Sequence, residues 1–116
     1  MATIKHFIGD ESEYRRMSMS SDIEPRALHE IYLPPFEAAV KRARTWAVLS
    51  SYNKVNGAHV LEQMDLISGI CCEQWDYDGL VMSDWFGIRR PSPSIAARTG
   101  KCRALPTIAA QSCLLR

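Results

Sequence analysis

The feature that most constrains the fold is the apolar run Leu80-Val81-Met82, which leads without a break into Ser83-Asp84-Trp85. A continuous apolar run is typical of a strand that helices cover on both faces of a parallel sheet. Residues 46–50 form a second such run, and residues 60–75 between them repeat apolar side chains at helical spacing. The pattern predicts adjacent parallel strands at 46–50 and 79–83, joined by a helix within 60–75 through a right-handed crossover.

A polar side chain follows each of these strands, Tyr52 after the first and Asp84 after the second. Parallel strands end at the same edge of a sheet, so we expect Tyr52 and Asp84 on one edge. In α/β barrels this edge carries the catalytic residues. From spacing alone, the simpler explanation is that Asp84 caps the next helix or begins a turn.

Four segments together favour a catalytic interpretation because they resemble the motifs of glycoside hydrolase family 3, the β-glucosidase family. They are Lys5-His6-Phe7, the segment 26–36 (RALHEIYLPPF), the segment 51–57 (SYNKVNG) and the segment 79–87 (GLVMSDWFG). They occur in the family's order over residues 4–87, and the resemblance ends at Gly87.

The resemblance implies a role for five residues. Asp84 would be the nucleophile, and Tyr52 would donate a hydrogen bond that orients its carboxylate. Lys5 and His6 would bind hydroxyl groups of the sugar, and Trp85 would offer a ring for the sugar to stack on. Taken alone, Lys5-His6 also fits a solvated lysine beside a core histidine, and Tyr52 fits a loop residue with its hydroxyl in water. The family's acid/base Glu lies in a later domain, outside this chain.

The implied activity is retaining β-glucosidase-type hydrolysis of O-glycosidic bonds in carbohydrate metabolism, with a β-glucoside or oligosaccharide as substrate. No metal and no organic cofactor is expected. The implied fold is an α/β (β/α)8 TIM-like barrel with parallel strands. A closed barrel takes about 250 residues, whereas this chain has 116. We therefore expect a fragment whose barrel is not closed and which is inactive by itself.

Related specificities are distinguished only in part. The N-acetylglucosaminidase branch of the family has Pro-Gly-His-Gly after its Lys-His pair, and residues 8–11 do not match it. A β-xylosidase or arabinosidase remains an alternative, because most residues that discriminate the sugar's 5-hydroxymethyl group lie outside this chain.

The end of the chain differs in composition from the rest. Residues 1–87 hold 8 Lys and Arg against 13 Asp and Glu, a net charge of −5, whereas residues 88–116 hold 6 and none, a net charge of +6. Codons for the tail can be chosen so that reading from the last base of the Gly87 codon gives the family's Glu-Met-Pro-Gly-Pro motif. We therefore divide the chain into a barrel fragment, residues 1–87, and a frameshifted, unstructured tail, residues 88–116.

Two functions from other classes remain: a non-catalytic remnant, and a nucleic-acid binder that acts through the basic tail. The tail has no aromatic residue to stack on a base, and its apolar residues 95–97 and 114–115 are unlike a solvated basic arm. We therefore expect no nucleic-acid partner.

The remaining features of the sequence carry little specificity. The four cysteines lack the spacing of a zinc or redox motif, and we expect free thiols. No signal peptide and no membrane-spanning segment is visible, which favours the cytoplasm, although a fragment could have lost its leader. The oligomeric state stays open.

Overall fold

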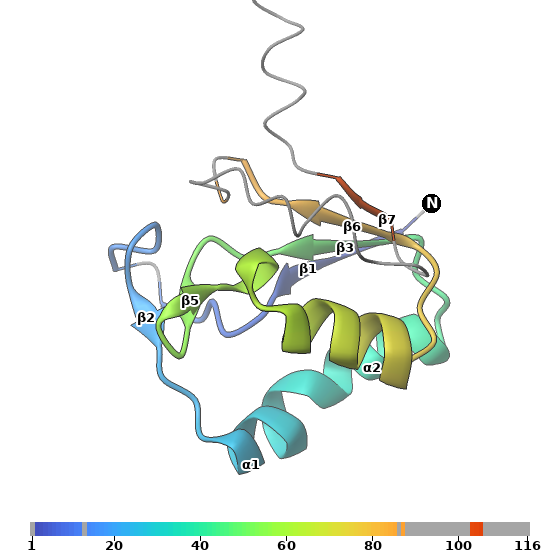
Figure 1. Ribbon diagram of the computed structural model, residues 1–116, viewed down its shortest axis with the longest axis horizontal. Helices are drawn as coiled ribbons and strands as arrows, with labels where there is room; N and C mark the ends of the chain where they lie inside the picture. The colour runs from blue at the N-terminus through green and yellow to red at the C-terminus, as the bar shows by residue number, and fades with distance from the viewer. Residues whose placement is uncertain (1, 13, 86, 88–102, 106–116) are drawn as a thin grey trace, which may run out of the picture.

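The computed structural model describes residues 2–12, 14–85, 87 and 103–105 (Figure 1). In chain order, its elements are β1 (Thr3–Phe7), β2 (Ser20–Ser21), α1 (Pro25–Ala27), the π-helical segment η1 (Leu28–Tyr32), α2 (Leu33–Lys41), β3 (Ala47–Ser50), β4 (Lys54–Val55), β5 (Ala58–His59), the 3-10 turn η2 (Val60–Glu62), the π-helical segment η3 (Asp65–Gln74), β6 (Leu80–Ser83) and β7 (Arg103–Leu105).

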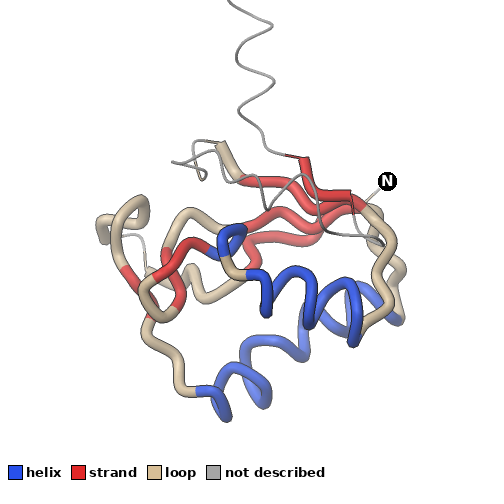
Figure 2. The backbone as a smooth tube through the Cα atoms, in the orientation of Figure 1, coloured by secondary structure: helices blue, strands red, loops and turns tan. Residues whose placement is uncertain are grey.

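A four-stranded parallel sheet in the order β1-β3-β6-β7 forms the centre of the fold. Strands β3 and β6 pair in register, with Ala47 opposite Leu80 and Ser50 opposite Ser83. The helix η3 connects them. Figure 2 shows the helices on one side of the sheet. The prediction of two adjacent parallel strands joined by a helix is confirmed, and the sheet is an open α/β fragment that does not close into a barrel.

The hydrophobic core lies between the sheet and these helices. Val48 of β3 and Val81 of β6 are fully buried, and the core also includes Cys71 of η3. At the end of β1, the Phe7 ring packs edge-on against Phe36 of α2, with 5.0 Å between ring centroids. Each large apolar side chain that is fully buried contributes about 1.5–3 kcal/mol to stability. Burial therefore fixes the positions of the strands whose ends carry the site.

The helical region 25–41 differs from what its prolines suggest. A proline pair at positions 34 and 35 predicts an interruption, yet η1 runs directly into α2. The backbone N–H of Leu33 bonds to the carbonyl of Leu28, the wider spacing of a π-helix. The prolines then occupy the first turn of α2, where a missing N–H removes no helical hydrogen bond. The chain therefore passes both prolines without a break.

A second, small sheet in the order β2-β4-β5 lies beside the site. Strands β4 and β5 form a hairpin whose turn is Asn56-Gly57, with φ of 50° and 89°. Two consecutive left-handed residues define the tight turn that favours Asn-Gly. Strand β2 ends the polar segment 10–21 and pairs in parallel with β4. This pairing holds the segment near the loop that carries Tyr52.

Only three tail residues are described, and they form β7 alongside β6. At these three positions the structure differs from an unstructured tail. An edge strand presents unpaired N–H and C=O groups, so pairing with β6 makes little demand on the side chains of the added segment. The rest of 88–116 lies outside the described residues.

The cysteines also differ from expectation. Cys71 is free and buried, but Cys72 is disulfide-bonded, so the prediction of free thiols is wrong for Cys72. Within the described part of the chain, no helix combines the length and apolar character needed to cross a bilayer.

Candidate active site

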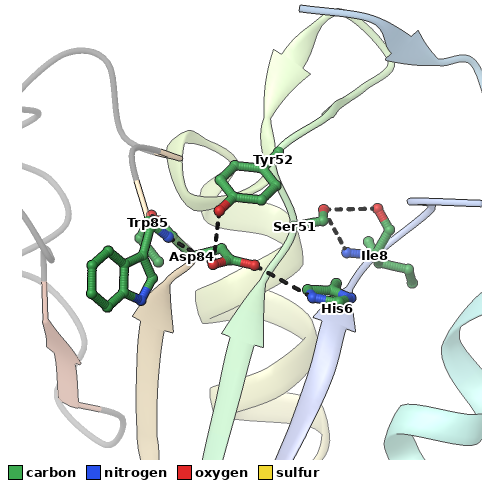
Figure 3. Close-up of polar contacts among 7 residues, drawn as sticks. His6, Ile8, Ser51, Tyr52, Asp84 and Trp85 are labelled. Carbon is green, nitrogen blue, oxygen red and sulfur yellow. Dashed lines mark hydrogen bonds and ion pairs between the residues drawn. The ribbon is translucent and has the colours of Figure 1, made fainter. Parts of the chain in front are cut away.

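The candidate site is centred on the carboxylate of Asp84, immediately after β6 (Figure 3). Its backbone N–H continues the sheet ladder by donating to the Ser50 carbonyl at 3.3 Å. The Asp84 carbonyl in turn accepts bonds from the Ser83 hydroxyl at 2.7 Å and from the Gly87 N–H at 2.9 Å. A β-carbon at Gly87 would lie 2.8 Å from Ser83 Oγ and 3.1 Å from the Asp84 carbonyl oxygen, so this tight turn favours glycine. Asp84 is thus fixed by its backbone.

Tyr52 comes from the loop after β3 and points at the same carboxylate (Figure 3). Its hydroxyl donates to Asp84 Oδ1 at 3.1 Å. The pKa of the Tyr52 phenol is raised above 10.0, first by burial and then by the hydrogen bond to Asp84 and its negative charge. The phenol therefore stays protonated at neutral pH and acts as a donor.

His6 and Lys5, which are neighbours in β1, differ in where they lie. His6 Nε2 is 3.4 Å from Asp84 Oδ2, on the side of the carboxylate away from Tyr52. Lys5 is exposed and lines, with His6, a cavity of about 410 Å³ that is also bordered by Asp10 and Tyr32. The structure therefore brings His6 to the carboxylate, whereas Lys5 lines the neighbouring cavity.

Trp85 contributes two separate groups. Its backbone N–H donates to Asp84 Oδ1 at 2.7 Å, and its side chain is 69% exposed. Figure 3 shows the indole beside Asp84. An exposed indole at this position offers an apolar face next to the carboxylate.

Arg16 is a residue of the site that sequence reasoning missed. Its guanidinium lies 5.0 Å from the centroid of the Tyr52 ring, within the range of a cation–π contact. Its positive charge also lowers the pKa of Tyr52, which opposes the larger effects of burial and Asp84. Arg16 lies in the polar segment 10–21, which has no regular period. The one available signal was the Arg15-Arg16 pair within it.

Among residues 2–12, 14–85, 87 and 103–105, no group of three or more His, Cys, Asp or Glu side chains is arranged to hold a metal ion. Oxygen Oδ1 of Asp84 already accepts two hydrogen bonds. The arrangement is that of a carboxylate oriented by donors.

The fold and the site together define a class of protein. A carboxylate held at the C-terminal edge of a parallel sheet by a phenol, an imidazole and a backbone amide is an arrangement suited to an α/β-barrel enzyme. The family model described as the glycosyl hydrolase family 3 N terminal domain matches residues 1–105. The chain belongs to this glycosyl hydrolase family. The match extends past Gly87, where the resemblance in short motifs ends.

Similar proteins agree with this assignment. The chain is 54% identical over 96 residues to a beta-glucosidase of Rhizobium radiobacter and 49% identical over 96 residues to probable beta-glucosidase I of Aspergillus niger. Each alignment covers 83% of this chain and 12% of the relative. The structure of beta-glucosidase 3B from Thermotoga neapolitana in complex with glucose aligns with a TM-score of 0.80 and 37% identity, over 98% of this chain and 16% of the other. This chain thus spans a small part of the length of its relatives.

Proposed function

We propose that this chain carries the nucleophile part of a retaining β-glucosidase active site, with Asp84 as the nucleophile. The observation that supports this role is the environment of the Asp84 side chain, which is 11% exposed and accepts hydrogen bonds from Tyr52 and from the Trp85 backbone. Two donors on a largely buried carboxylate fix its orientation. A nucleophile that attacks a sugar carbon needs a fixed orientation.

The two carboxylate oxygens have different tasks in this proposal. Oδ1 accepts from the Tyr52 hydroxyl and the Trp85 N–H, whereas Oδ2 faces His6 at a longer distance of 3.4 Å. The less engaged Oδ2 keeps more of its lone-pair density for bond formation. Oδ2 therefore attacks the anomeric carbon and Oδ1 remains hydrogen-bonded.

The reaction then follows two balanced steps. A bond forms between Asp84 Oδ2 and the anomeric carbon while the bond to the leaving oxygen breaks, and a carboxylic acid protonates that oxygen. Water next attacks the anomeric carbon from the side opposite Asp84 and gives a proton to the second carboxyl group, which the first step left ionised. The bond between Asp84 Oδ2 and the anomeric carbon breaks, and Asp84 is released. That second carboxyl group has to lie about 5–5.5 Å from Asp84 in a retaining enzyme. By resemblance, it comes from a later domain of the family.

Binding of the sugar involves the groups around the carboxylate. His6 and Lys5 provide donors for hydroxyl groups, and the exposed Trp85 indole provides a stacking surface. The beta-glucosidases among the relatives, and the glucose in the Thermotoga neapolitana complex, support a β-glucoside as substrate. The 116-residue chain by itself supplies only one of the two carboxyl groups, so it is inactive.

The experiment uses a restored enzyme, in which residues 1–87 of this chain replace the matching segment of the Rhizobium radiobacter beta-glucosidase. It should hydrolyse an aryl β-glucoside, whereas the 116-residue chain should not. Asp84→Asn should abolish turnover without unfolding the restored enzyme. In Asp84→Ala, azide can occupy the space of the lost carboxylate and attack the anomeric carbon, which should give an α-glucosyl azide from the aryl β-glucoside. Near-normal turnover in Asp84→Asn would remove Asp84 from the nucleophile role.

A further inference from the structure

Behind the site, two buried polar residues flank Tyr52 on either side. Ser51 is 3% exposed and Asn53 is fully buried, while Tyr52 between them reaches out to Asp84. Buried polar side chains have to find hydrogen-bond partners, because an unmade bond costs about 1–3 kcal/mol. Their partners therefore show what this loop is attached to.

Ser51 is attached to the chain that leaves β1. Its hydroxyl accepts from the Ile8 N–H and donates to the Ile8 carbonyl, both at 3.1 Å (Figure 3). Its own N–H donates to the Phe7 carbonyl at 2.6 Å. One serine thus fixes a peptide segment that begins directly after His6.

Asn53 is attached to the same segment one residue further on. Its amide nitrogen donates to the Gly9 carbonyl at 2.9 Å and lies 3.3 Å from the Ile8 carbonyl. It also lies 3.1 Å from the Lys54 carbonyl. Rotating the amide would turn its oxygen toward three carbonyl oxygens, so the orientation is fixed. Among the described residues, Asn53 Oδ1 has no hydrogen-bond partner.

These side-chain bonds lie at the end of β1, next to the stretch where its pairing with β3 is irregular. The pairing of β1 with β3 shifts register between Ile4 and Phe7, the stretch that contains His6. Pairing resumes at Phe7, which lies opposite Ser50 at the end of β3. Beyond this pair, the side-chain bonds from Ser51 and Asn53 connect the segment after His6 with the loop after β3.

We propose that Ser51 and Asn53 are positioning residues for catalysis: they tie the loop carrying Tyr52 to the segment after His6, so that both partners of Asp84 are held against its carboxylate. Both act through Tyr52 and His6 and contact neither substrate nor reacting atoms. The proposal rests on the role of Asp84 proposed above. Displacements of about 1 Å at a catalytic group reduce rates by about 100-fold, so a buried tie of this kind matters for turnover.

The test follows the Tyr52 phenol, whose pKa depends on its contact with Asp84. The 116-residue chain is labelled with ¹³C at the tyrosine ring carbon that bears the hydroxyl and is titrated by NMR. Asp84→Asn provides the reference without a carboxylate. Ser51→Ala and Asn53→Ala should each lower the pKa of Tyr52 toward that reference, because part of a hydrogen bond to a charged group is lost.

Two further variants serve as controls. Ser68→Ala removes a buried hydroxyl that has no hydrogen-bond partner among the described residues, and it should leave the pKa of Tyr52 unchanged. Ser51→Thr keeps the hydroxyl and should retain the wild-type value. If Ser51→Ala does not fold, Ser51→Cys fills nearly the same volume with a weaker donor and gives the same readout.

The proposal is overturned if the Ser51 and Asn53 variants fold, have lowered melting temperatures and keep the wild-type pKa of Tyr52. Ser51 and Asn53 would then serve packing alone. The titration needs no turnover, so its result is independent of the azide and Asp84→Asn experiments. If the pKa of Tyr52 shifts in the Ser51 and Asn53 variants but the Asp84→Asn enzyme is active, the nucleophile role of Asp84 is refuted. The positioning of Tyr52 by Ser51 and Asn53 is then still supported.

Discussion

The hydroxyl of Tyr52 donates to Oδ1 of Asp84 across 3.1 Å, although 32 positions of sequence separate the two residues. The contact arises because each residue follows one of two strands that are paired in register. Two short paired strands and the helix that connects them therefore bring a phenol and a carboxylate to the same edge of the sheet.

Removing the Tyr52 hydroxyl should reduce the rate of the restored enzyme. Hydrogen bonds to charged groups are worth about 1.5–3 kcal/mol, which corresponds to a reduction of about 10- to 150-fold in kcat for Tyr52→Phe. Steady-state kinetics with an aryl β-glucoside measure this. The unaltered restored enzyme is the control, and a kcat within twofold of it would show that the contact has no catalytic value.

Burial of Cys71 should make stability depend on alkaline pH. Burial raises the pKa of the Cys71 thiol to about 12 from 9.0. Between pH 9.0 and about pH 12, the folded protein keeps the proton of the Cys71 thiol, whereas the unfolded chain releases it. Stability is therefore present below pH 9 and is lost as pH rises toward 12, by about 1.4 kcal/mol per pH unit.

Urea unfolding at pH 8, 9, 10 and 11 measures this loss. Cys71→Ala should be less stable at pH 8, because it leaves a small cavity, but its stability should fall less steeply above pH 9. Parallel pH dependences for the two proteins would contradict a buried, protonated thiol.

Two glycines with open surroundings should respond in opposite directions to alanine. No atom lies within 4 Å of a β-carbon added at Gly57 or at Gly69, so neither substitution creates a clash. Gly57 has a φ of 89°, which alanine rarely adopts, and Gly57→Ala should destabilise by about 1 kcal/mol. Gly69 lies inside η3, and Gly69→Ala should stabilise by about 0.5–1 kcal/mol. Thermal unfolding of both variants beside wild type tests the pair, and shifts of the same sign would contradict the assignment.

The gene should contain a single-base shift at or just after the Gly87 codon. Reading the tail in the shifted frame should then give the family's Glu-Met-Pro-Gly-Pro motif from the bases that now encode residues 100–105. Such a shift would also account for the absence of acidic and aromatic residues from 88–116. Sequencing the gene from genomic DNA and from its transcript decides the question. If no shifted frame contains the motif, the basic tail has to be explained as an evolved segment.

Residues whose positions follow from periodicity were predictable, and residues whose positions follow from loop conformation were not. The apolar runs predict β3, β6 and η3 and therefore the meeting of Tyr52 with Asp84. The backbone N–H of Trp85 and the guanidinium of Arg16 reach the site through a turn and a loop, which have no repeating pattern.

The proline pair in α2 illustrates a different limit. Local rules predict a break before Pro34. The helix continues through a widened turn in η1, where the Leu33 N–H bonds to the Leu28 carbonyl. Such an adjustment depends on packing around the whole segment and leaves no trace in residue spacing.

The order β1-β3-β6 within the sheet has a consequence for how the protein is made. Strand β3 pairs with β1, and β6 pairs with β3. During synthesis, β3 and β6 therefore each leave the ribosome after the strand with which they pair. The sheet can therefore form in the order of translation, because each new strand adds to an edge that is already present.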